Sequence, residues 1–214
     1  MGRETVAINP ETGQRISIDV LMQRLTKLSK IRANSDDIDE HVARLKAESD
    51  RGVMILAATM LDDALLTALG RVMPKANNRI RNQIFSNDGP LSTLSTLSKR
   101  TIFAEAAGLI TPTVAKQINV IRRIRNVAAH AHAAVDFSLD EVKQALATMF
   151  QDNEMGDDFE TWSQAKVRNF YLQICGYIAD HLIGGAGGLV GAATSPDAIH
   201  GLFRALKASD LSAT

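Results

Sequence analysis

The sequence has little of several features on which particular classes of protein depend. One cysteine occurs among 214 residues, so neither an intramolecular disulfide nor a four-cysteine zinc site can form. Aromatic residues make up 5%, too few to suggest a platform on which single-stranded bases stack. Lys+Arg and Asp+Glu both number 24, so the net charge is zero. Because phosphate contacts supply much of the affinity for DNA, we do not expect direct binding to duplex DNA.

Motifs for metals, cofactors and membranes are equally scarce. The histidines show no His-Glu-x-x-His or His-x3-His spacing, so we expect no metal site, and no glycine pattern for a nucleotide cofactor occurs. The start of the sequence, "MGRETVAINPETGQ", has no apolar run, so we expect no signal peptide and a cytoplasmic protein. The most apolar stretch, residues 52–70, is interrupted by Asp62 and Asp63, which favours a buried helix over a membrane span.

What remains is helical periodicity, which predicts an all-α protein with a bundle of about five helices. Residues 1–17 differ, because short alternating runs flank an Asn-Pro-Glu-Thr-Gly turn, and we expect a short hairpin-like or irregular arm there. The bundle domain is predicted over 18–183. Residues 184–214 form a Gly-rich linker and a short tail.

Local patterns place several helix ends. Residues 34–73 read as one long helix or two in line, and its second half is apolar almost all round, as in a central helix. A helix from about Leu91 to Ala107 should close at Gly108, and Thr111 with Pro112 should start the next. A capping box of Ser138 and Glu141 predicts the start of another helix, which should end at about Phe150. A last long helix is predicted over about 160–182.

The segment "IRRIRNVAAHAH", residues 121–132, contains the candidate catalytic residues, since it combines three arginines, an asparagine and two histidines. On a helix, the apolar residues of 112–132 fall on one arc, and the polar ones, including Arg122, Asn126 and His130, fall opposite. Arg125 lies at the border of the two arcs. Arginine offers a planar donor fork for phosphate, and histidine exchanges protons near neutral pH. Arg125, Asn126 and His130 would suffice for metal-independent RNA cleavage, with Arg122 and His132 as supporting residues.

A structural interpretation is equally open. Positive charge near a helix C-terminus is favourable, so Arg and His suit this end of the helix. A buried carboxylate needs a partner, and Asp62 or Asp63 could pair with an arginine of the row from Arg122 to Arg125. Charge is also uneven along the chain, since residues 71–100 are basic and residues 136–160 are acidic. Either region is a solvated surface or an interaction face.

Two resemblances bear on this helix. The pattern Arg125-Asn126-x3-His130 resembles the motif of HEPN domains, all-helical modules that often dimerise and often act as ribonucleases. The resemblance implies that Arg125 binds the scissile phosphate, that His130 transfers protons and that Asn126 orients these two groups. The site would be completed across a homodimer.

A second resemblance spans roughly residues 51–137. "AATMLDDALLTAL", "GPLSTLSTLSKRTIFAEAAGLIT" and "INVIRRIRNVAAH" occur in the order that is typical of the mannitol operon repressor (MtlR) family. That family implies an all-helical regulator with no DNA-binding motif of its own, which acts through protein partners. The hairpin-like arm and the Gly-rich tail depart from the family.

We therefore expect an MtlR-like regulatory protein that forms a homodimer, with a HEPN-type metal-independent endoribonuclease as the alternative. A third possibility is an accessory HEPN-like module of a larger complex. The first predicts a protein partner and the second predicts RNA as substrate. Neither predicts a cofactor or a membrane.

Overall fold

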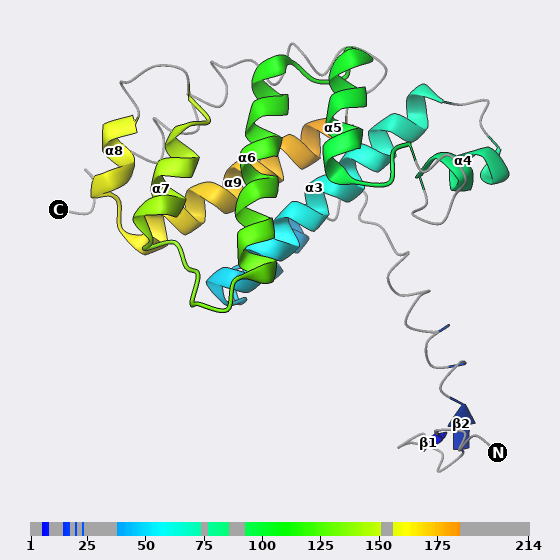
Figure 1. Cartoon of the computed structure of the whole chain (residues 1–214), viewed down its shortest axis with the longest axis horizontal. Coiled ribbons are helices and arrows are strands. Elements are labelled where there is room, and N and C mark those ends of the chain that lie inside the picture. Colours follow the sequence, from blue (N-terminus) through cyan, green and yellow to red (C-terminus); the bar gives the residue numbers. More distant parts are fainter. Residues whose placement is uncertain are drawn as a thin grey trace. The chain divides into compact units, whose positions relative to one another are not determined.

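The computed structural model describes residues 6–8, 15–17, 20, 23, 38–73, 77–85, 93–150 and 156–184. The chain divides into two compact units, residues 1–32 and 33–214. The described part of the first unit is mainly a two-stranded antiparallel hairpin of β1 (Val6–Ile8) and β2 (Arg15–Ser17) (Figure 1). Ala7 lies opposite Ile16 in the register. The hairpin predicted within residues 1–17 is therefore present.

The second unit is helical, which confirms the all-α class. Its described residues form eight helices rather than about five, because two short helices, residues 78–85 and 156–161, join the longer ones and two helices, not one, lie within 34–73. They are α2 (Ile38–Leu45), α3 (Asp50–Val72), α4 (Asn78–Phe85), α5 (Leu97–Ala106), α6 (Pro112–His130), α7 (Asp140–Ala147), α8 (Gly156–Thr161) and α9 (Gln164–Gly184). The predicted Gly-rich tail lies, after residue 184, outside the described residues.

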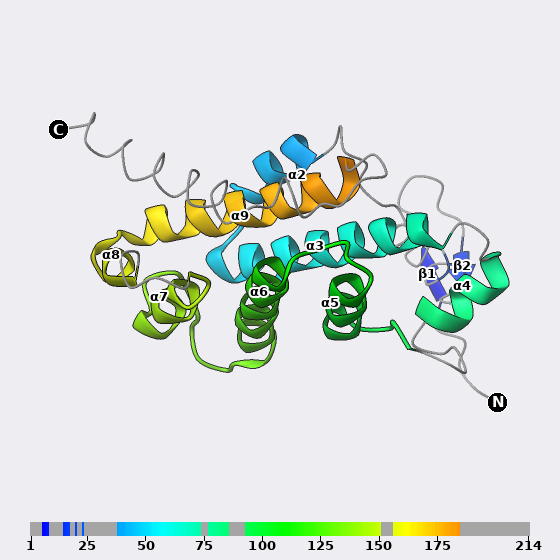
Figure 2. The same ribbon diagram turned by 90° about the horizontal axis from the view of Figure 1, so that it is seen from above.

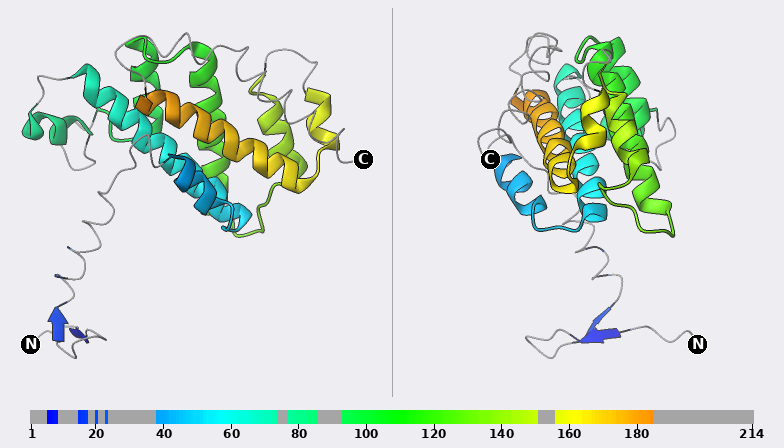
Figure 3. Two further views of the ribbon diagram at one scale, coloured as in Figure 1. Left: turned by 180° about the vertical axis from the view of Figure 1, so that it is seen from behind. Right: turned by 90° about the vertical axis from the view of Figure 1, so that its left-hand side faces the viewer.

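The helices of this unit stack in one order. α3 lies between α9 on one side and the row of α5, α6 and α7 on the other, and α2 packs against α9 (Figure 2). The end-on view of Figure 3 shows the same order. α5 and α6 are neighbours and both cross α3 (Figure 1). This crossing brings the start of α5 and the second half of α6 to the same part of α3.

α3 is the central helix that its apolar residues predicted. It contacts α2, α5, α6 and α9, and its buried residues include Val53, Ala57, Leu61 and Leu65. By length and composition alone this helix could cross a membrane, and 56% of its most apolar window is buried inside the protein. Core helices of soluble proteins meet the same criterion, so its composition is explained by the packing around it.

Local chemistry explains where several helices start and end. Thr111 accepts a hydrogen bond from the Val114 N–H at 3.3 Å, and Pro112 occupies the first turn of α6, as predicted. Gly108, just beyond α5, has φ 69°, a conformation that glycine adopts without strain. α5 begins at Leu97, later than predicted, because Thr96 caps it and accepts from the Lys99 N–H at 3.4 Å.

The capping box predicted at Ser138 is wrong. α7 starts at Asp140, and its N-cap Leu139 makes no side-chain capping bond. Ser138 instead donates from its N–H and its hydroxyl to the Asp136 carboxylate, at 2.8 and 2.5 Å. These hydrogen bonds lower the pKa of Asp136 below its ordinary value. A local Asx-type turn has thus replaced the expected cap.

The segment 34–73, expected to form one long helix or two in line, forms two helices that a cluster of charged groups joins to α9. α2 and α3 are separated by the turn at residues 46–49, so α2 folds back to contact α9. Arg168 of α9 pairs with Asp50 at 2.6 Å and donates to the carbonyls of Lys46 and Glu48 at 3.0 and 2.6 Å. Asp50 also accepts from the Phe137 N–H at 3.1 Å. One ion pair therefore fastens the α2–α3 turn, the start of α7 and α9 together.

Candidate functional site

The arginine row of α6 lies along the groove between α5 and α6. α6 buries its apolar arc, including Ile118, Ile121 and Ile124. Arg122, Arg125 and Asn126 are half-buried, whereas Arg123 is exposed. The predicted division of this helix into a core face and a polar face is confirmed except at Val127, which was placed on the core arc and is 55% exposed. Three of the polar side chains are partly enclosed by neighbouring helices.

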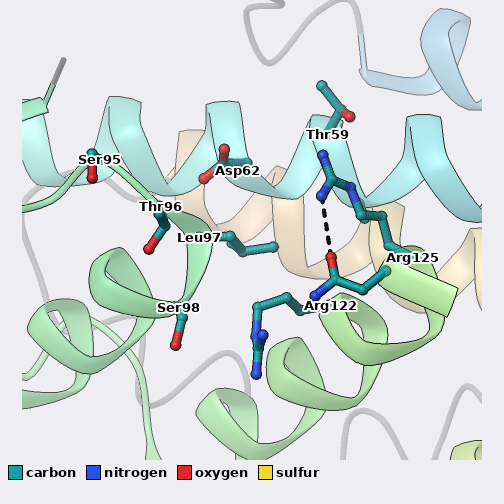
Figure 4. A pocket seen from close by; sticks show the side chains of 10 residues that line it. Thr59, Asp62, Ser95, Thr96, Leu97, Ser98, Arg122 and Arg125 are labelled. Atoms are coloured by element: carbon teal, nitrogen blue, oxygen red, sulfur yellow. Dashed lines mark hydrogen bonds between the residues drawn. The ribbon is translucent and has the colours of Figure 1, made fainter. Parts of the chain in front are cut away.

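These three side chains line a pocket of about 500 Å³. α3 contributes Ala58, Thr59 and Asp62, and residues 95–98 at the start of α5 form the opposite wall. Figure 4 shows Arg125 extending toward Thr59 over α3, while Arg122 points away from α3 along α5. The pocket therefore has a guanidinium group on each of two sides. Its size falls in the range of small-molecule sites.

The guanidinium groups of Arg122 and Arg125 each donate a hydrogen bond to an asparagine side chain. Arg125 donates from Nη1 to the Asn126 Oδ1 at 3.1 Å, and Arg122 donates from Nε to the Asn119 Oδ1 at 3.4 Å. Within the described residues, neither arginine forms an ion pair. Each guanidinium has five N–H donors, so most of its donor capacity remains for water or a ligand. An amide neighbour orients a guanidinium without neutralising its charge.

The wall from α5 adds hydroxyl groups and a helix start. Ser95, Thr96 and Ser98 all line the pocket. Thr96 is the N-cap, and the first N–H groups of any α-helix have no intrahelical acceptor. The sequence analysis did not assign these residues a role. The sequence "STLSTLSKR" carries a pattern that could have found them, since a threonine three residues before Lys99 is a typical N-cap position.

Asp62, the acidic residue of the lining, has a different partner from the one predicted. Arg100 of α5, not an arginine of the Arg122–Arg125 row, pairs with it, with Nη1 to Oδ1 at 2.6 Å. The Arg100 side chain is 9% exposed and that of Asp62 is 31% exposed. Arg100 also donates from Nε to the Leu94 carbonyl at 2.8 Å. This pair neutralises the acid at the pocket and fixes the loop before α5 to α3.

Asp63, the other acid considered for an ion pair, is half-buried and does not line the pocket. Its backbone carbonyl accepts a hydrogen bond from the Thr67 hydroxyl at 2.9 Å.

The two histidines of the motif are not in the pocket. His130 is the last residue of α6 and is exposed, and His132 lies beyond the helix and is exposed. Between them, the Ala131 carbonyl accepts from Arg51 Nη2 at 2.8 Å, which ties the end of α6 to α3. The structure thus brings together Arg122, Arg125 and Asn126, but His130 and His132 do not line the same cavity.

Other reactive groups of the described chain are built into the core. Cys175 is buried and burial raises its pKa, so the thiol is a packing group rather than a nucleophile. Tyr171 is also buried, which raises its pKa, and its hydroxyl donates to the Met54 carbonyl at 3.0 Å. Among the described residues, no group of three or more His, Cys, Asp or Glu side chains could hold a metal ion.

The fold and the pocket define a helical-bundle protein whose candidate site is a polar, arginine-bearing cavity. No protein-family model matches the chain. No curated protein matches it either. A solved structure that is similar is the X-ray structure of the MtlR–HPr complex from Escherichia coli, with a TM-score of 0.55 and 18% sequence identity. The match covers 68% of this chain and 98% of that one. At this identity the likeness shows an MtlR-like fold.

Proposed function

We propose that this protein is a cytoplasmic regulator that acts by binding a partner protein, as MtlR is seen bound to HPr. The observation that carries the proposal is the likeness of its helical fold to nearly the whole of that chain. A further point in favour is the zero net charge, because proteins that bind DNA directly usually carry an excess of basic residues. Repression and a homodimeric state are parts of the same proposal.

Of the two charged regions, we take the acidic one, residues 136–160, as the proposed contact surface. In the basic segment 71–100, Arg100 is buried against Asp62, and Arg81 donates to the Gly70 carbonyl. These two cations are bound within the fold, whereas Arg71, Arg79 and Lys99 are exposed, so the experiment below decides between the two regions. In the acidic region, Asp140 and Glu141 of α7 are exposed. Exposed charges steer a partner of opposite sign, so the partner should present a basic surface.

The test is a calorimetric titration of the full chain with HPr. We expect saturable binding that Glu141→Lys weakens and that high salt weakens further. Glu105→Lys is the matched control, because Glu105 is also exposed but lies on α5. Binding that both variants weaken equally would remove the acidic surface from the proposal. No binding of HPr to the folded wild type would remove HPr as the partner.

The ribonuclease alternative retains one specific observation in its favour. Arg125 and Asn126 face an open pocket and Arg125 has no ion pair within the described residues. His130 is exposed one turn further along the same helix. An active centre would therefore need His130 to approach the phosphate from outside the pocket, for example from a second copy of the chain. RNA cleavage in EDTA that is lost in both Arg125→Ala and His130→Ala would establish it.

A further inference from the structure

We propose that the pocket between α3, α5 and α6 binds a small molecule that carries a phosphate monoester. The proposal is independent of which protein the chain contacts. It rests on the composition, charge and size of the pocket. These three properties are considered in turn, and each excludes a different class of ligand.

The lining is polar. Of its ten residues only Ala58 and Leu97 are apolar, and the other eight carry hydroxyl, amide, carboxylate or guanidinium groups. Sites for apolar ligands are lined mainly by hydrophobic and aromatic side chains. No aromatic residue lines this pocket, so it offers no surface on which a nucleobase could stack. Both apolar ligands and nucleotides therefore fit it poorly.

The charge of the lining is positive. Arg122 and Arg125 contribute two cations, and the carboxylate of Asp62 is already paired with Arg100 at 2.6 Å. Arginine forks match the geometry of phosphate oxygens and bind them with charge-assisted hydrogen bonds. The hydroxyls of Ser95 and Ser98 add further hydrogen-bond donors to the lining. A negatively charged ligand is the one that these groups stabilise.

The size argues for more than a free ion. A volume of about 500 Å³ is much larger than a single phosphate needs. The two guanidinium groups also lie apart along the lining, with Arg125 near Thr59 and Arg122 pointing away from α3 (Figure 4). A phosphate on one guanidinium would leave room for an organic portion that extends toward the other. We therefore assign a phosphate monoester rather than inorganic phosphate.

The test compares probes and matched variants of the full chain by calorimetry. Ribose 5-phosphate, inorganic phosphate, ribose and a short RNA oligomer serve as probes. Arg122→Gln and Arg125→Gln each remove one pocket cation. Arg123→Gln removes an exposed cation of the same helix that does not line the pocket. Thermal unfolding of each variant shows that the fold is retained.

We expect one ribose 5-phosphate per chain, and each pocket variant should weaken it about tenfold or more, as for a lost charge-assisted hydrogen bond. Arg123→Gln should change the affinity less than about twofold, because it alters only a screened surface charge. Ribose should not bind. Equal weakening by Arg123→Gln, equal or tighter binding of inorganic phosphate, binding of the RNA oligomer alone, or no binding of any probe would each overturn the assignment.

Discussion

The ion pair between Arg100 and Asp62 gives a quantitative test of how the pocket is built. Arg100→Met keeps most of the side-chain volume but removes the guanidinium. It leaves the Asp62 carboxylate without its partner at 2.6 Å and the Leu94 carbonyl without its donor at 2.8 Å. Removing one partner of a buried pair costs about 3–5 kcal/mol. Because the Asp62 side chain is 31% exposed and can regain water, the lower end, about 3 kcal/mol, applies.

The free energy of unfolding can be measured by urea denaturation of the wild type and variants. For a chain of this length a loss of about 3 kcal/mol corresponds to a fall in Tm of roughly 6–12 °C. Lys99→Met is the matched control, since Lys99 is exposed on the same helix, and it should stay within about 0.5 kcal/mol. A loss below about 1 kcal/mol for Arg100→Met would refute the structural role of this pair. A double-mutant cycle with Asp62→Asn isolates the coupling energy between Arg100 and Asp62.

Three further predictions concern the core. Arg168→Ala should lower the free energy of unfolding by about 3 kcal/mol, because it leaves the largely buried Asp50 carboxylate without its cation and three backbone carbonyls without a donor; urea denaturation measures this, and an unchanged midpoint would contradict it. Tyr171→Phe should cost about 0.5–1.5 kcal/mol, because it removes the hydrogen bond from the Tyr171 hydroxyl to the Met54 carbonyl, and a neutral effect in the same assay would count against that hydrogen bond. The Cys175 thiol should not react with a thiol reagent until the protein unfolds, because burial disfavours the thiolate; rapid labelling of the native protein would show the core to be open.

The features that were predictable from sequence depend on short-range chemistry. The start of α6 at Thr111 and Pro112 and the turn at Gly108 follow from residues that lie within one helical turn of each other. The central position of α3 follows from its apolar composition, because only a helix packed on several sides can bury such a surface. In these cases the local pattern and the tertiary packing agree.

The failures have two physical causes. The Ser138 capping box failed through local competition, because Ser138 donates to the Asp136 carboxylate in a local turn and α7 starts later, at Asp140. The prediction of the partner of Asp62 failed because that partner is set by tertiary packing. Both α5 and α6 cross α3, and which of them places its arginine against Asp62 depends on the angle and register of packing, which periodicity does not specify.

The candidate site was predictable only in part. Arg122 and Asn126 were placed on the polar face of one helix and Arg125 at its border, and all three line a pocket. The hydroxyl groups of residues 95–98 were not, because they come from a helix that is distant in sequence. The catalytic roles suggested for Arg125, Asn126 and His130 stay predictions, as do the domain limits at 17 and 183.

The measurement that tests the regulator proposal most directly is the molar mass of the protein in solution, alone and mixed with HPr, by light scattering during size-exclusion chromatography. The chain has a mass of 23.2 kDa. The account predicts a homodimer of twice that mass when the protein is alone and a heavier, stoichiometric complex after HPr is added. A mass that does not change on addition of HPr would contradict a regulator that works through this partner.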